Sequence, residues 1–431
     1  MYSTEELIRK IEDEKFDKVC KELYQADDQQ CSLVRNRYSS LAKEYLDVFG
    51  NENVQVFSTP GRTEISGNHT DHNHGKVLAG SINLDTIAIA GKTNNGIISI
   101  KSEGYEKQFV VDTKSLDVIQ DESGTSLSLV RGIVSKFNEL GYNYGGFNAV
   151  LTSDVLVGSG LSSSAAFEVQ IGTILNYLYN EGSIDNIEIA KIGQYAENVY
   201  FGKPCGLMDQ VACAVGGIVS IDFQDPGAPF VNKVDFDFVD SGYSLLVVDT
   251  GGSHSDLTNE YASIPSEMKS VAKSLDKNVA REISDVSFYN NIPQLRKEFG
   301  DRAVLRVLHF INENKRVTQQ VKFLEEGKFD KFLELVKESG NSSFKYLQNC
   351  YTTEDIKNQG ISLALELTDE YLIEKGAGAG RVHGGGFAGT IQVFLPGEFV
   401  DEYINKVESI FGKESVLKLF IREQGSILVE I

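Results

Sequence analysis

The chain has 431 residues, of which 41% are hydrophobic and 24% charged, as in a globular protein with a large core. Its formal net charge of −21 argues against binding to nucleic acid or to an anionic membrane, because phosphates are bound mainly through Lys and Arg. The five scattered cysteines form no CxxC pair, so neither a zinc ribbon nor a disulfide framework is expected. The charged N-terminus and the lack of about 18 consecutive apolar residues predict a soluble, cytoplasmic protein.

The first fifty residues predict an N-terminal helical extension. Apolar residues recur at helical spacing over residues 4–27 and 32–48, and Gly50 ends the second helix. Further on, short β-branched segments predict strands and amphipathic segments predict helices. The predicted strands are 54–57, 86–90, 97–101, 108–111, 147–152, 218–223, 243–250, 390–395, 416–421 and 426–431. The predicted helices are 128–141, 162–180, 187–201, 256–275, 301–327, 354–374 and 399–412.

Strands and helices do not alternate regularly along the chain, so the pattern favours an α+β fold over a doubly wound sheet. The sequence DPGAP interrupts the pattern after residue 224. We therefore predict an extension at 1–50, an N-terminal domain at 51–225 and a C-terminal domain at 226–431.

The stretch GRTEISGNHTDHNHG (61–75) holds three of the six histidines of the chain, His69, His72 and His74. It could form a metal site, a sugar site or a solvated turn. The histidine spacing matches no common zinc motif. Neutral His, Asp and Asn also offer the donors and acceptors that sugar hydroxyls need, so the stretch by itself leaves the sugar site and the solvated turn open beside the metal site.

A second polar stretch, VLVGSGLSSSAAFEVQIG (155–172), runs from an apolar segment through two glycines and three serines into a helix. Unpaired N–H groups at a helix N-terminus attract anions, and glycines let the backbone approach a phosphate closely. A serine-rich helix cap is the alternative. Three consecutive serines exceed what a cap requires, so the pattern favours phosphate binding.

Two further stretches carry weaker signals. GAGAGRVHGGGFAG (376–389) is either a linker or a loop that passes close to a ligand. In FGKPCGLMDQVACAVGG (201–217), Asp209 lies among apolar neighbours, where it either caps a helix or takes part in chemistry. Glu197, in a predicted helix, is either a surface residue or a magnesium ligand.

Together these stretches resemble the motifs of the GHMP small-molecule kinases, and among them the galactokinase family. The segments that carry the resemblance are GRTEISGNHTDHNHGKVLAG, VGSGLSSSAA, CGLMDQ and RVHGGGFAG, in this order, over residues 54–396. The resemblance implies a two-domain fold with the active site in the cleft between the domains. It also implies an ATP-dependent sugar 1-kinase that transfers the γ-phosphate of ATP to the anomeric hydroxyl of galactose.

The resemblance implies a role for each matching position. Asp209 and Arg62 match catalytic residues. The positions that match sugar contacts are Asn68, His69, Asp71, Gly206 and Tyr261. The phosphate-binding positions are Gly158, Gly160, Ser162, Ser163 and Ser164. Ser164 and Glu197 match ligands of Mg²⁺, and the expected partners are a galactose-like sugar and ATP, bound by a monomer.

Two departures from the family bear on the substrate. GNHTDHN stands where the family has GEHTDYN, so Asn68 replaces a glutamate that binds the C6 hydroxyl. A neutral amide predicts looser discrimination at C6. One alternative is therefore a kinase for a C6-modified or other galactose-like sugar such as galacturonate. The resemblance also leaves a second alternative, a non-catalytic sensor of galactose and ATP, because some relatives of the family act as ligand-gated regulators. The chain also lacks tryptophan, so any aromatic contact to adenine must come from another side chain.

Overall fold

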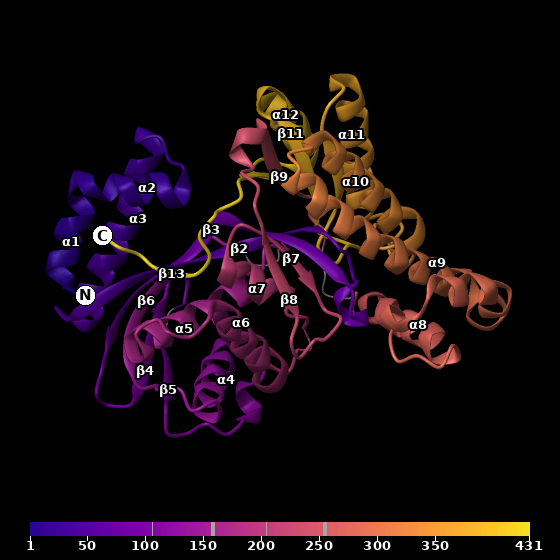
Figure 1. Ribbon diagram of the computed structural model, residues 1–431. Helices are drawn as coiled ribbons and strands as arrows, with labels where there is room; N and C mark the ends of the chain where they lie inside the picture. Colours follow the sequence, from indigo (N-terminus) through magenta and orange to yellow (C-terminus); the bar gives the residue numbers. More distant parts are fainter. Residues whose placement is uncertain (106, 157–159, 204, 253–256) are drawn as a thin grey trace.

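Two β-sheets organise the computed structural model, which describes residues 1–105, 107–156, 160–203, 205–252 and 257–431 (Figure 1). The first sheet has the order β1-β2-β3-β6-β4-β5, with β13 paired to β2, β7 to β3 and β8 to β7. Its strands are β1 (Tyr2–Ser3), β2 (Asn53–Ser66), β3 (Lys76–Lys92), β4 (Ile97–Ser102), β5 (Phe109–Asp112), β6 (Phe147–Ser153), β7 (Ile218–Asp222), β8 (Phe230–Val234) and β13 (Ile427–Leu428).

The second sheet is antiparallel and has the order β10-β11-β9-β12. Its strands are β9 (Tyr243–Asp249), β10 (Ala379–His383), β11 (Thr390–Pro396) and β12 (Val416–Leu419). In the first sheet only β4 and β6 pair in parallel among the described strands. The mixture of mostly antiparallel sheets with separate groups of helices confirms the predicted α+β class.

Twelve α-helices surround the two sheets in the described part of the chain. They are α1 (Thr4–Glu12), α2 (Asp17–Tyr24), α3 (Asp28–Phe49), α4 (Ser126–Glu139), α5 (Ser163–Asn180), α6 (Asn186–Tyr195), α7 (Met208–Val215), α8 (Thr258–Ser274), α9 (Asp285–Glu325), α10 (Phe329–Ser342), α11 (Gly360–Lys375) and α12 (Val400–Phe411). Single π-helical turns follow α6 (Ala196–Phe201) and α10 (Ser343–Leu347). No helix in the described ranges has the length and apolarity needed to cross a membrane.

Alternation along β3 places its side chains in two separate cores. Ile87 and Ile89 pack into the apolar cluster formed with α1, α2 and α3. Ala88 and Ala90 belong to the larger cluster that includes residues of α4 to α7. The helical extension therefore covers one face of the first sheet and the helices of the predicted N-terminal domain cover the other (Figure 1).

The extension differs in detail from the predicted helices 4–27 and 32–48. The first predicted helix is divided at Asp13, whose carboxylate caps a short 3₁₀ turn before α2. The second predicted helix begins four residues earlier than expected, because Asp27 and Gln30 form a reciprocal capping box and α3 begins at Asp28.

The largest difference concerns the polar stretch 61–75. The strand predicted at 54–57 continues to Ser66, and the strand predicted at 86–90 begins already at Lys76. Polar side chains in β2 are buried against specific partners, whereas strand prediction relies on apolar periodicity. For the same reason β10 was missed within the glycine-rich stretch 376–389. Helices α7 and α10 and strand β8 were also not predicted, and α9 begins at Asp285 with a break at Gly300.

The predicted division into domains at residues 225 and 226 stays a prediction. Two strands from beyond this boundary, β8 and β13, pair within the first sheet. Ile421 also forms a bridge to Ile82 in β3. The end of the chain thus returns to the first sheet, beside the N-terminal helices (Figure 1).

Asp85 in β3 forms hydrogen bonds to the N-terminal helices and to the C-terminal segment. Its carboxylate is fully buried and accepts hydrogen bonds from Arg37 of α3 at 2.6 Å, Tyr24 of α2 at 2.7 Å and Arg422 near the C-terminus at 3.1 Å. It also accepts a hydrogen bond from Ser58 of β2. Burial alone would raise the pKa of Asp85, but the charges of Arg37 and Arg422 lower it below its ordinary value.

We predict that Asp85→Asn lowers the free energy of unfolding by about 3–5 kcal/mol, because it leaves the fully buried Arg422 without its anion. The pKa of Asp85 is depressed in the folded state, so its contribution to stability is complete above the pKa of an unfolded Asp, about 4. The contribution is lost as the pH falls through the lower folded pKa. Denaturant unfolding at pH 7 and at acid pH measures both effects.

Asp154→Asn is the matched control for this experiment. Asp154 also pairs with Arg37, at 2.9 Å, but its side chain is 51% exposed, so the change should cost no more than about 1 kcal/mol. Equal losses of stability in the two variants would contradict the central role of Asp85.

Candidate active site

Arg62 and Asp209 form a bidentate ion pair at the centre of the candidate site. The guanidinium of Arg62, on β2, donates from Nε and from Nη2 to the two carboxylate oxygens of Asp209, on α7, both at 2.7 Å. The third nitrogen of Arg62 donates to the carbonyl oxygen of Gly160, and Ser162 donates to Asp209. Asp209 was predicted either to cap a helix or to take part in chemistry. It bonds Arg62 rather than the N-terminus of α7, which has no side-chain cap.

The environment of Asp209 keeps its carboxylate ionised. Burial would raise its pKa, but the charge of Arg62 and the hydrogen bonds from Arg62 and Ser162 lower the pKa below its ordinary value. About a third of the Asp209 side chain is still exposed. The site therefore presents an anionic oxygen that is fixed in position and accessible to a ligand.

Helix α5 points its N-terminus at this region. Its N-cap residue, Ser162, has a left-handed backbone and makes no side-chain cap hydrogen bond, which argues against the alternative that the serines only cap the helix. The hydroxyl groups of Ser163 and Ser164 have no hydrogen-bond partner among the described residues and are half-buried. Unpaired backbone N–H groups and free hydroxyls suit a phosphate. The predicted phosphate contact Gly158 lies outside the described residues.

The loop after β2 brings the predicted sugar contacts to the same place. A Cβ atom on Gly206 would lie 2.1 Å from Oδ2 of Asp71, so these two residues touch just before α7. His69 donates from Nε2 to the carbonyl oxygen of Gly385 at 2.8 Å, and its ring stacks on that of Tyr261 with the centroids 6.4 Å apart. Burial lowers the pKa of His69 to about 4. A neutral His69 with a free Nδ1 can accept a hydrogen bond from a hydroxyl.

Asn68 has a different environment from the other predicted sugar contacts. It is fully buried, and its amide nitrogen donates to Glu64 at 2.8 Å and to the carbonyl oxygen of Gly384 at 2.7 Å. Its amide oxygen accepts from Asn349 at 2.6 Å, and its backbone carbonyl lies 3.0 Å from Nε2 of His309. These contacts occupy the amide with protein partners, so the geometry does not support the predicted contact between Asn68 and the sugar.

A cluster of oxygen ligands lies beside α7. Gln210, next to Asp209, donates from Nε2 to Glu168 at 2.9 Å and to Glu197 at 3.0 Å. The second oxygen of Glu168 and the amide oxygen of Gln210 are buried without a partner. Burial and then repulsion from Glu197 raise the pKa of Glu168 well above its ordinary value. Ser164 precedes Glu168 by one helical turn and shares its face.

The carboxylates of Glu168 and Glu197 are of the type that a hard cation prefers. In this structure Lys203 lies 3.4 Å from Glu197, and the amide nitrogen of Gln210 donates to both carboxylates. Glu197 is buried at 4% exposure, so the alternative that it is an ordinary surface residue is wrong. Sequence reasoning missed Glu168 and Gln210. Glu168 follows Ser164 by four residues in a predicted helix. This spacing could have identified Glu168 as a neighbour of Ser164 on the same helix face.

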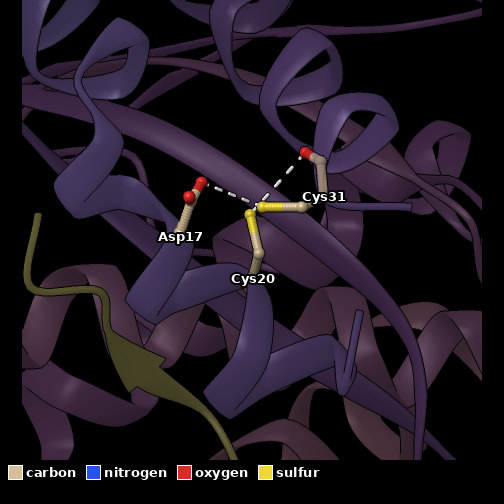
Figure 2. Close-up of side chains that lie close together, drawn as sticks. All are labelled: Asp17, Cys20 and Cys31. Carbon is tan, nitrogen blue, oxygen red and sulfur yellow. Dashed lines mark hydrogen bonds between the residues drawn. The ribbon is translucent and has the colours of Figure 1, made fainter. Parts of the chain in front are cut away.

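Among the described residues, only Asp17, Cys20 and Cys31 were found to place three potential metal-ligating atoms within 4.8 Å of one another (Figure 2). Arg35 donates to the carboxylate of Asp17, where a metal cation would be repelled. Burial raises the pKa of Cys20 to about 12 and also raises that of Cys31, so both thiols stay protonated. This group is a packing cluster of the extension, and the histidine-rich stretch 61–75 does not form such a group.

The glycine-rich stretch 376–389 lies against β2. Arg381 is fully buried and donates to the carbonyl oxygen of Ile65 at 2.7 Å and to Glu64 at 3.3 Å. His383 lies 3.1 Å from the hydroxyl of Thr63, and a Cβ on Gly160 would lie 3.3 Å from its ring. The stretch is therefore not a linker. Its first part is a strand that joins the second sheet to the candidate site.

Comparisons with known proteins agree with this geometry. The GHMP kinases N-terminal domain family matches residues 128–217, and the galactokinase galactose-binding signature matches residues 43–92. A galactokinase of Streptomyces coelicolor is 29% identical over 379 residues, which cover 86% of this chain and 92% of that protein. The chain is galactokinase-like. The predicted resemblance to the GHMP kinases is thereby confirmed, and the chain is a phosphotransferase of the sugar-kinase class.

Solved structures confirm the fold of this galactokinase-like chain. The galactokinase of Lactococcus lactis, solved with galactose, has a TM-score of 0.75 at 23% identity and covers 90% of this chain and 98% of its own. A mevalonate kinase of Methanococcus jannaschii has a TM-score of 0.60 at 14% identity and covers 86% and 98%. The predicted two-domain kinase fold of the α+β class is therefore correct.

We predict that Gly206→Ala lowers kcat/KM for galactose by about 100-fold, since displacement of a substrate-positioning group by about 1 Å has effects of that size. The new methyl group must displace the carboxylate of Asp71. Galactose-dependent release of ADP measures the effect.

Gly397→Ala is the control, because its Cβ would make an ordinary contact at 3.7 Å. Wild-type kinetics for Gly206→Ala would show that Asp71 does not need its present position.

Proposed function

We propose that this chain is an ATP-dependent sugar 1-kinase that transfers the γ-phosphate of ATP to the anomeric hydroxyl of galactose. The observation that carries the proposal is the exposed, ionised carboxylate of Asp209, which is fixed by Arg62 beside the N-terminus of α5. Phosphoryl transfer needs a positioned hydroxyl and a site that stabilises negative charge, and these two elements supply them. All residues in the proposal belong to one chain, so a monomer is sufficient, and we expect it in the cytoplasm, where ATP is available.

Asp209 orients the anomeric hydroxyl in this mechanism. Its lowered pKa makes it a weak base towards a free alcohol, so it takes the proton as the bond from the sugar oxygen to phosphorus forms. Arg62 holds both carboxylate oxygens and thereby fixes the direction from which the hydroxyl is accepted. The proton passes from the anomeric oxygen to Asp209, and ADP leaves with the electrons of the broken bond.

The phosphates of ATP bind at the N-terminus of α5 in this proposal. The free hydroxyls of Ser163 and Ser164 and the N–H groups of the first turn contact the phosphate oxygens. Ser164 and Glu197 would hold Mg²⁺, with Glu168 close by. A bound Mg²⁺ would neutralise charge on the β- and γ-phosphates.

The contacts of the sugar are proposed as His69, Asp71, Gly206 and Tyr261. His69 accepts through Nδ1, Asp71 accepts through its carboxylate, and Tyr261 provides an aromatic surface. A non-catalytic sensor is not favoured, because the ion pair and the serines expected of a kinase are all present. Phosphorylation of a sugar panel with detection of ADP tests the function, and failure to phosphorylate any sugar would refute it.

We predict that Asp209→Asn lowers kcat by about 10²–10⁴, the usual contribution of a positioned acid–base group. The dissociation constant for galactose, measured by calorimetry without ATP, should change little. Asp225→Asn, in the exposed turn after β7, serves as the control. A variant Asp209→Asn that retained most of its kcat would remove Asp209 from the mechanism.

We predict that Glu197→Gln and Ser164→Ala raise the Mg²⁺ concentration required for half-maximal activity and lower kcat, because a hard cation prefers anionic oxygen ligands. Titration of Mg²⁺ at fixed ATP measures this. Glu188→Gln, on α6, is the matched control. Wild-type titrations for both site variants would show that the metal site lies elsewhere.

A further inference from the structure

Glu64 is a buried carboxylate of β2 that the proposed mechanism does not use. Arg62 and Glu64 are two residues apart, and the register of β2 against β3 is regular between them. Side chains at such positions point to the same face of a strand. Because Arg62 points towards Asp209, Glu64 points towards the candidate site as well.

The two oxygens of Glu64 have different surroundings. Oε1 accepts hydrogen bonds from Asn68 at 2.8 Å and from Arg381 at 3.3 Å. Oε2 has no hydrogen-bond partner in the described ranges, and it keeps some solvent-accessible surface. The side chain as a whole keeps 7% of its surface exposed. One oxygen is thus anchored, and the other is left without a partner.

The position of Glu64 along β2 relates it to the sugar. Two residues of a strand span about 6.6 Å, so Glu64 follows the reacting end at Arg62 by about the length of a sugar ring. It precedes the loop that carries His69 and Asp71. A carboxylate oxygen at this place accepts hydrogen bonds and repels anions.

We propose that Glu64 is a specificity-determining residue, whose free oxygen accepts a hydrogen bond from a sugar hydroxyl remote from the anomeric centre. This inference rests on the proposed function, since it assumes that the sugar binds between Asp209 and His69. Asn68 and Arg381 hold the carboxylate in place. Glu64 therefore supplies the anionic acceptor that the neutral Asn68 cannot provide, and it selects a neutral, hydroxylated sugar over an anionic one such as galacturonate.

The test is Glu64→Gln, compared with wild type on galactose and on each monodeoxygalactose. Arg381 and Asn68 both donate towards position 64, so the amide introduced there must turn its oxygen to them and its NH₂ group to the sugar. A charge-assisted hydrogen bond is thereby lost, and we expect kcat/KM for galactose to fall by about 10- to 100-fold. The deoxygalactose that lacks the contacted hydroxyl should be affected less than about threefold, and galacturonate should gain relative to galactose.

A purely structural role for Glu64 gives a different result. Loss of the partner of Arg381 would then lower kcat/KM for all sugars by the same factor, and this outcome would overturn the proposal. Ser66→Ala is the matched control on the same strand. Ser66 donates to Glu313 rather than towards the site, so the ratios between sugars should stay as in wild type.

Two further measurements keep the test decisive. If Glu64→Gln does not fold, the double variant Glu64→Gln with Arg381→Gln removes both charges together, which costs less than leaving one buried charge unpaired. The ratios between sugars are then measured in this variant. Calorimetry of galactose binding to wild type separates the two proposals: no binding refutes the proposed function, whereas binding with unchanged ratios in the variants refutes only the role of Glu64.

Discussion

The structure depends on finding partners for the buried polar side chains of β2. Burial of a polar or charged group without a partner costs several kcal/mol, and the second half of β2 buries Arg62, Thr63, Glu64 and Ser66 in sequence. All of them bond segments that are distant in sequence. Arg62 binds Asp209 of α7, whereas Ser66 donates to Glu313 of α9. The strand can therefore be buried only when these distant segments have assembled around it.

This constraint joins the stability of the protein to the geometry of its site. Thr63 accepts a hydrogen bond from Gln392 of the second sheet, and Arg381 of the same sheet reaches Glu64. The contacts that hold the second sheet against β2 thus also hold the residues that would bind the sugar. A site built on strands and fixed by buried partners keeps its groups in position before a ligand arrives, which is what phosphoryl transfer requires.

The sequence predicted the elements whose signal is apolar periodicity, and it predicted the site through motifs. The amphipathic helix α4 and the apolar strand β6 lie within two residues of their predicted bounds. The extension of β2 beyond residue 57 could not be predicted, because partners such as Glu313 and Arg381 lie hundreds of residues away. Asn68 illustrates the same limit in the site: its residue type suggested a ligand contact, while its neighbours in the fold use every group of its amide.

The distribution of charge explains how a chain of net charge −21 can accommodate a polyanion. Arg62 is the cation at the centre of the site, but Asp209 and the carbonyl of Gly160 occupy its donors. In the proposed function the phosphates are stabilised by the N-terminus of α5, whose partial positive charge needs no side chain. Glu197, on the turn after α6, would repel a bare nucleotide. In the proposed function a divalent cation held by Ser164 and Glu197 would offset this repulsion, because a cation neutralises part of the negative charge of the phosphates.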